Sequence, residues 1–237
     1  MSQPFGEFDV SAHFDESLAG KYDRRIRLFC PSYDALHWML VPWLVGLPER
    51  SYFLSAGAGT GAEIVTLGRR FPFWRFVAVD ASSEMLAACR ERLSGAGLAE
   101  RLEFFKGLLQ QYRAPTPLDD ASSVFVAHFI KNRDEKLAYF RSVADSLKPG
   151  GLFVLADLFG DKDSPEFARL LDVWFTSYES HGVSAEDLAR DRAHVMNDVS
   201  FISEDDIHDM LIEAGFSPQI RFYQTYLFGG WVTTNHV

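Results

Sequence analysis

The sequence predicts an α/β fold in which a mostly parallel sheet carries helices on both faces and closes with a C-terminal antiparallel hairpin. Two observations support this. Short apolar runs alternate with amphipathic segments from residue 51 to residue 157, which is typical of parallel strands joined by crossover helices. The tail "PQIRFYQTYLFGGWVTT" instead contains two strand-like runs close together, as in a hairpin.

Two helical segments are expected before the first strand. Apolar side chains of the first segment recur at helical spacing, at Phe14, Leu18, Tyr22, Ile26 and Phe29. Pro31 separates this segment from a second amphipathic stretch, "SYDALHWMLVPWL", at residues 32–44. The first strand is therefore preceded by a helical cap.

The alternating part of the chain then gives each element in order. Strands are expected at residues 51–55, 75–80, 101–105, 122–130 and 151–157, and helices at 61–70, 83–94 and 134–147. Residues 163–194 are expected to form a helical insertion, and Ser203 to cap a helix that ends at Gly215. We expect a single domain with four parts: the cap (1–50), a core (51–160), an insertion or lid (161–200), and the last helix with the hairpin (201–237).

Composition limits the class of function. The 237 residues carry a formal net charge of −10, which argues against binding to nucleic acid, since that binding rests on Lys and Arg. A small-molecule partner is expected instead. Cys30 and Cys89 form no CxxC pair, so neither a disulfide framework nor a metal site is indicated. With no signal peptide or membrane-spanning run in the sequence, we expect a cytoplasmic protein without a membrane partner.

A glycine-rich turn follows the first expected strand in "FLSAGAGTGAEI", residues 53–64. Gly57, Gly59 and Gly61 between a strand and a helix bring backbone N–H groups close to a ligand. Asp80 ends the second expected strand, about 20 residues on, where a carboxylate accepts from ribose hydroxyls. The turn also fits G-x-G-x-x-A through Ala62, so the motif alone leaves a dinucleotide site open.

The wider pattern resembles the class I S-adenosylmethionine-dependent methyltransferases, which have a Rossmann-like seven-stranded sheet. The resemblance rests on "GAGTG", on "VDASSEMLAACRERL" after the second strand and on "SLKPGG" before the fifth. It implies S-adenosylmethionine as cofactor and methyl transfer to a small-molecule acceptor. The N-terminal "FDESLAGKYDRRIRLFCPSYD" also resembles a subgroup that includes the carboxy-S-adenosylmethionine synthases of tRNA modification, and implies that Tyr33 faces the cofactor.

The resemblance also implies roles for individual residues. It places Gly57, Ala58 and Gly59 at the methionine half of the cofactor, Asp80 at the ribose, Ala81 and Met85 at the adenine, and His128 and Phe129 facing cofactor and acceptor. Two positions depart from the family pattern. Ser55 stands where an acid usually orders the loop and helps to hold the amino group, and Leu108 stands where an aspartate often accepts from adenine. Both remain cofactor-site candidates.

Residues for the methyl-transfer step must be identified separately from those that bind the cofactor. Methyl transfer needs proximity and orientation, with a base only if the nucleophile loses a proton. His128 is the candidate base, although a histidine in "VAHFI" also fits a pocket wall; His181 and His194 are expected in solvent. Candidate acceptor residues are Trp174, Tyr178, Arg192 and Tyr226. Their aromatic surface would also suit a homodimer contact.

Three alternatives stay open at this point. A carboxy-S-adenosylmethionine synthase would need Arg192 to face the sulfonium, because the resemblance implies an arginine that grips the extra carboxylate. The departures at Ser55 and Leu108 are also compatible with a non-catalytic binding protein. A nicotinamide enzyme is disfavoured by "LKPGG" and the terminal hairpin.

Overall fold

The structure is a computed structural model that describes the backbone of residues 16–237 and the side chains from residue 22 onward. The expected helical position Phe14 lies outside the described residues. Within them, one seven-stranded sheet has the strand order β3-β2-β1-β4-β5-β7-β6. The parallel strands are β1 (Tyr52–Ala56), β2 (Arg75–Asp80), β3 (Leu102–Lys106), β4 (Asp120–Val124) and β5 (Leu152–Leu158).

The sheet closes with the hairpin that the sequence predicts. Strand β7 (Phe228–Thr234) pairs antiparallel with β5, from Leu152 opposite Thr234 to Leu158 opposite Phe228, and β6 (Ile220–Thr225) forms the edge. The predicted fold class is therefore confirmed.

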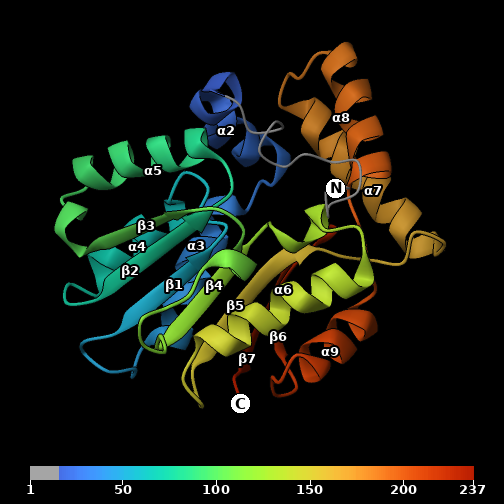
Figure 1. The fold of residues 1–237 in the computed structure, drawn as a ribbon. Helices are drawn as coiled ribbons and strands as arrows, with labels where there is room; N and C mark the ends of the chain where they lie inside the picture. Colours follow the sequence, from blue (N-terminus) through green and yellow to red (C-terminus); the bar gives the residue numbers. More distant parts are fainter. Residues whose placement is uncertain (1–15) are drawn as a thin grey trace, which may run out of the picture.

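Helices cover both faces of the sheet (Figure 1). One face carries α3 (Tyr33–Leu44), α4 (Ala62–Arg70) and α5 (Ser83–Gly95), and the other carries α6 (Arg133–Ser146) and α9 (Glu204–Glu213). Side chains alternate between the two buried layers as strand geometry requires. In β2, Phe76 and Ala78 enter one apolar cluster while Val77 and Val79 enter the other.

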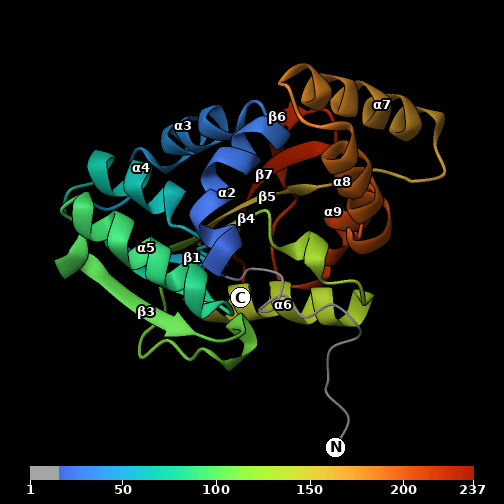
Figure 2. The same cartoon turned by 90° about the horizontal axis from the view of Figure 1, so that it is seen from above.

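Three helices lie over the edge at which the parallel strands end (Figures 1 and 2). They are α2 (Glu16–Phe29), α7 (Pro165–Ser180) and α8 (Ala185–Asp198). Asp23 holds α2 against the glycine turn, because it accepts a hydrogen bond from Thr60 Oγ1 at 2.8 Å and forms an ion pair with Arg92 of α5. Among the helices of residues 16–237, none is long and apolar enough to cross a membrane.

Two expected elements differ from those observed. The strand expected at 122–130 ends at Val124, because Phe125 adopts a left-handed backbone (φ +59°) and residues 127–129 form a 3-10 turn, η3 (Ala127–Phe129). The helical insertion consists of two helices, α7 and α8, separated by a turn at Gly182 (φ +79°). The other strands and the helices between them lie within two residues of the expected bounds.

The contacts of Asp23 predict that Asp23→Ala loosens α2 selectively. Two partly exposed, charge-assisted contacts are lost, which should cost about 1 to 2 kcal/mol. Hydrogen exchange followed by mass spectrometry should show faster exchange in α2 than in the wild type, with the sheet unchanged. Asp34→Ala is the matched control, because Asp34 pairs with Arg27 on the exposed surface. Equal effects of the two substitutions would contradict the role of Asp23.

Candidate active site

The glycine turn and the end of β2 are joined by backbone hydrogen bonds. The N–H groups of Gly57 and Ala58 both donate to the carbonyl of Val79, at 2.8 and 2.9 Å. Asp80 accepts from the N–H of Gly59 at 2.8 Å and from that of Ser82 at 2.9 Å. A carboxylate has about four acceptor positions, so Asp80 keeps capacity for the two hydroxyls of a ribose.

Gly57 and Gly59 meet different surroundings. A Cβ on Gly57 would lie 2.3 Å from a methyl group of Val126, so packing within the protein already requires glycine there. At Gly59 (φ +52°), no atom of the described residues lies within 4 Å of the position that a Cβ would take. Packing therefore does not explain Gly59: its left-handed backbone favours glycine, and the open space beside it leaves room for a ligand.

The remaining cofactor candidates lie at the same edge of the sheet. Met85 is buried in the first turn of α5, and its N–H donates to Ser82 Oγ. Ala81 directly follows Asp80. Leu108 follows β3, and the preceding Gly107 donates its N–H to the carbonyl of Asp80 at 2.9 Å. Tyr33 is buried at the start of α3, with its ring against those of His37 and Phe125.

Ser55 has an acidic partner on the following helix. Its hydroxyl donates to the carboxylate of Glu63, and both side chains are buried. Burial raises the pKa of Glu63 to about 7 and also raises the pKa of Asp80. The turn between them is therefore bordered by two carboxylates.

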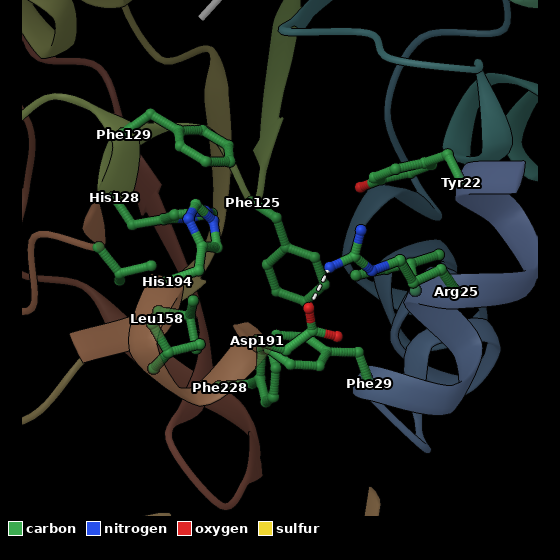
Figure 3. Close-up of a pocket in the computed structure, with 13 residues that line it drawn as sticks. Tyr22, Arg25, Phe29, Phe125, His128, Phe129, Leu158, Asp191, His194 and Phe228 are labelled. Atoms are coloured by element: carbon green, nitrogen blue, oxygen red, sulfur yellow. Dashed lines mark hydrogen bonds and ion pairs between the residues drawn. The ribbon is translucent and has the colours of Figure 1, made fainter. Parts of the chain in front are cut away.

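A cavity of about 100 Å³ lies beneath α2 and α8. Its wall is mostly apolar, from Ile26, Phe29, Phe125, Phe129, Leu158, Val195, Val199 and Phe228. Figure 3 shows Tyr22, Arg25 and Phe29 projecting from α2 on one side, His128 and Phe129 on the other, and Phe125 between them. The cavity thus collects side chains from the cap, the core and the insertion.

His128 lines the cavity and pairs with Asp157, which lies behind the wall. Asp157 is at the end of β5, beside the turn that carries His128, and both side chains are about 95% buried. One Asp157 oxygen accepts from His128 Nδ1 and from the N–H of Leu158, and the other accepts from the N–H of His128 at 3.0 Å. A proton on Nδ1 leaves Nε2 as the acceptor.

The buried side chain of Lys136 lies near this pair and holds the segment that follows α8 against it. The N–H of Ser200 donates to the carbonyl of His128 at 2.8 Å, and Lys136 Nζ donates to the carbonyl and hydroxyl oxygens of Ser200. Burial lowers the pKa of Lys136, and the nearby Asp157 carboxylate opposes that shift. Lys136 therefore places a positive charge near Asp157, and the hydrogen bond from Nδ1 to Asp157 favours the Nδ1 tautomer of His128.

The opposite wall is closed by Asp191 of α8. Its buried carboxylate accepts from Arg25 of α2 at 2.6 Å and from Tyr178 of α7 at 2.8 Å (Figure 3 shows the first contact). His194 also lines the cavity and bonds to Asp198 at 2.9 Å, so the expectation that it lies in solvent is wrong. Asp191 and His194 are three residues apart on α8, so both lie on the face of the helix that is turned toward the cavity.

The four acceptor candidates do not line the cavity. Trp174 is fully buried, and its indole N–H donates to the carbonyl of Phe29 at 2.6 Å. Tyr178 lies behind the wall, bonded to Asp191. Arg192 is 42% exposed and pairs with Asp172 at 2.6 Å. Tyr226 is at the β6–β7 turn with φ +51°.

Four residues at this site were not predicted from the sequence: Phe125, Arg25, Asp157 and Asp191. Local sequence offers no signal for the left-handed backbone of Phe125, because phenylalanine rarely adopts it. Asp157 could have been noticed as an acid at the end of a buried strand. Arg25 and Asp191 are 166 residues apart in the chain, so their pairing depends on tertiary structure.

Comparison with known proteins adds the family relationship. Residues 53–151 match the methyltransferase domain family. A carboxy-S-adenosyl-L-methionine synthase of Pseudomonas fluorescens (strain SBW25) is 29% identical over 227 residues, which cover 92% of this chain and 91% of that protein. The synthase of Aeromonas hydrophila subsp. hydrophila is 24% identical, with 92% and 88% covered.

Solved structures show the same fold at low sequence identity. The DhpI–SAH complex has a TM-score of 0.64 at 17% identity, with 95% of both chains covered. The apo form of the S-adenosylmethionine-dependent methyltransferase SibL has a TM-score of 0.60 at 22% identity. This chain is covered to 84% in that match and spans only 56% of the SibL chain.

The geometry of Asp80 predicts that Asp80→Ala weakens binding of S-adenosylhomocysteine about ten-fold to a hundred-fold. This is the expected loss for hydrogen bonds between a carboxylate and ribose hydroxyls. Isothermal titration calorimetry measures it, and a cooperative thermal transition shows that the variant is folded. Unchanged affinity in the folded variant would remove Asp80 from the site.

Proposed function

We propose that this chain, which belongs to the class I S-adenosylmethionine-dependent methyltransferases, methylates a hydroxyl group of a small and largely apolar acceptor. The observation that carries the proposal is His128 in the wall of an apolar cavity, held from behind by Asp157. Such a pair is useful when the nucleophile must lose a proton. The acceptor class follows from the cavity, where hydrophobic contacts would bind an aromatic or aliphatic ring and His128 would select a hydroxyl.

The charges at the glycine turn support S-adenosylmethionine as the cofactor. Glu63 and Asp80 border this turn, and S-adenosylmethionine carries both a sulfonium and an ammonium group. Asp80 would suit the ribose of either cofactor, but a pyrophosphate at the turn would lie near the additional carboxylate of Glu63 and be repelled. Gly57, Ala58, Gly59 and Asp80 would hold the cofactor, with Met85 and Leu108 beside the adenine.

The side chains of the cavity have separable tasks. S-adenosylmethionine supplies an electrophilic methyl group when it is bound. The four phenylalanines exclude water and orient the acceptor ring, and α2 and α8 close the cavity over it. His128 Nε2 accepts the hydroxyl proton as the oxygen reacts, and Asp157 holds the imidazole and stabilises the imidazolium that forms.

The proposal predicts that His128→Asn lowers kcat about 10² to 10⁴-fold, the usual contribution of a general base. Affinity for S-adenosylhomocysteine should change less than about two-fold, since the glycine turn and Asp80 are unchanged. Asp157→Asn should also lower kcat, because it removes the preference for the Nδ1 tautomer. The measurement is steady-state kinetics on the best acceptor from a panel of phenols and alcohols, with calorimetry for the cofactor product.

His181→Asn is the matched control, because His181 ends α7 on the exposed surface, where its ring nitrogen bonds only to the Ser177 carbonyl among the interactions of the described residues. It should retain wild-type kcat. If His128→Asn retained kcat as well, His128 would be a wall residue, and the hydroxyl-acceptor proposal would lose its basis.

The names of the sequence relatives favour a second candidate, a carboxy-S-adenosyl-L-methionine synthase. That activity would need a cation for the extra carboxylate. Arg192 faces away from the cavity and pairs with Asp172, and Arg25 inside the cavity is already paired with the buried Asp191. Neither arginine offers the uncompensated charge that a carboxylate requires, so methyl transfer is the better-supported proposal.

Arg192→Lys separates the two candidates. For an exposed ion pair we expect changes below about 1 kcal/mol in stability and in affinity for both S-adenosylhomocysteine and carboxy-S-adenosylmethionine. Calorimetric titration of wild type and variant with both ligands measures this. A loss of affinity confined to the carboxylated ligand would favour the synthase, because lysine cannot reproduce a two-pronged guanidinium contact.

We also propose that the protein acts in the cytoplasm on a free small molecule. Cys30 and Cys89 are buried thiols without a disulfide, which suits a reducing compartment. The acidic net charge of −10 favours a small-molecule acceptor over nucleic acid. Homodimer formation and the single-domain organisation remain predictions of the sequence.

A further inference from the structure

Glu63 is a buried acid that takes no part in the proposed proton transfer. It is the second residue of α4, only 4% exposed, and its carboxylate accepts the hydroxyl hydrogen of Ser55. Burial raises its pKa to about 7. Placing a carboxylate this deep is unfavourable unless a cation or several donors compensate it.

The groups around Glu63 do not supply a cation. Each neighbouring element contributes a titratable group that is neutral or acidic: Asp80 from β2, Tyr22 from α2, Tyr33 from α3 and Cys89 from α5. Among the described residues, no lysine or arginine forms an ion pair with Glu63. Asp80 raises the pKa of Glu63 further.

The position of Glu63 relative to the glycine turn identifies what could compensate it. Ser55 lies two residues before Gly57, and Glu63 lies two residues after Gly61, so the hydrogen-bonded pair spans the turn at its base. Asp80 holds the far side of the turn through Gly59, where space is open. A ligand in this turn therefore meets a carboxylate near the end of β1 as well as the one at the end of β2.

We propose that Glu63, positioned by Ser55, is the anionic anchor for the amino group of the cofactor's methionine portion. In this chain the carboxylate comes from the helix after the turn, whereas the family resemblance places it at position 55 on the strand. Ser55 is then a positioning residue that orients Glu63. This inference rests on the proposed function, because it requires that S-adenosylmethionine binds at the turn.

The test compares two ligands that differ in the amino acid portion. S-adenosylhomocysteine carries the amino group, whereas 5′-methylthioadenosine has the same adenosine and thioether without it. Glu63→Gln should weaken S-adenosylhomocysteine about ten-fold to a hundred-fold by calorimetry and leave 5′-methylthioadenosine within about two-fold. The variant should be at least as stable as the wild type, because the glutamine keeps an acceptor for Ser55 and removes a buried charge.

A rescue variant controls for a structural effect. Adding Ser55→Asp to Glu63→Gln returns a carboxylate to the strand and should recover most of the lost affinity.

Proton release on ligand binding provides a second test that uses the wild-type protein alone. An ammonium group bound to Glu63 stabilises the ionised acid and lowers its pKa, so affinity should rise with pH up to about 7 and then level off.

Asp80 would contact the ribose that both ligands share, so the informative quantity is the difference in proton release between the two ligands. Near pH 7, S-adenosylhomocysteine should release more protons than 5′-methylthioadenosine. Equal proton release, or equal affinity changes for both ligands in Glu63→Gln, would overturn the anchor while leaving the cofactor assignment in place. Wild-type protein that binds neither ligand would overturn the proposed function, and the anchor with it.

Discussion

The turn after β4 is the constraint on which the site depends. Phe125 takes a left-handed backbone conformation at the last β4–β5 contact, where its N–H still donates to the carbonyl of Ala156 at 2.7 Å. That conformation costs about 1 to 3 kcal/mol, and it folds the chain back toward the neighbouring strand. As a result, His128 meets Asp157, and the ring of Phe125 forms part of the cavity wall. A straight continuation of β4 would separate these groups.

Two acids, the partly exposed Asp23 and the buried Asp191, hold the helices over the sheet edge. Asp23 ties α2 to the glycine turn and α5, and Asp191 ties the same helix to α8 and α7. In each case a single carboxylate receives donors from two other elements. Asp23 and Asp191 are each paired with an arginine, whereas among the described residues neither carboxylate at the glycine turn, Glu63 or Asp80, forms an ion pair with a lysine or arginine. This contrast favours a cationic ligand at the turn and a neutral acceptor under the lid.

The sequence predicted the parts of the fold that local pattern controls. Strand β2 matches its predicted bounds at 75–80, and the hairpin follows the alternation of its two runs. The predicted strand 122–130 was too long, because apolar periodicity in "SSVFVAHFI" does not reveal a left-handed residue. The site was harder: the glycine turn and Asp80 have sequence signatures, but the contacts of Glu63, Asp157 and Asp191 arise from packing between elements.

A crystal structure of the full chain with S-adenosylhomocysteine tests the central claim most directly, namely that the glycine turn and the His128 cavity form two halves of one site. The account predicts the ribose hydroxyls on Asp80, the amino group at Glu63, and the thioether sulfur at the opening toward His128. A ligand bound away from the glycine turn, or one whose sulfur is separated from the cavity by protein, would contradict it.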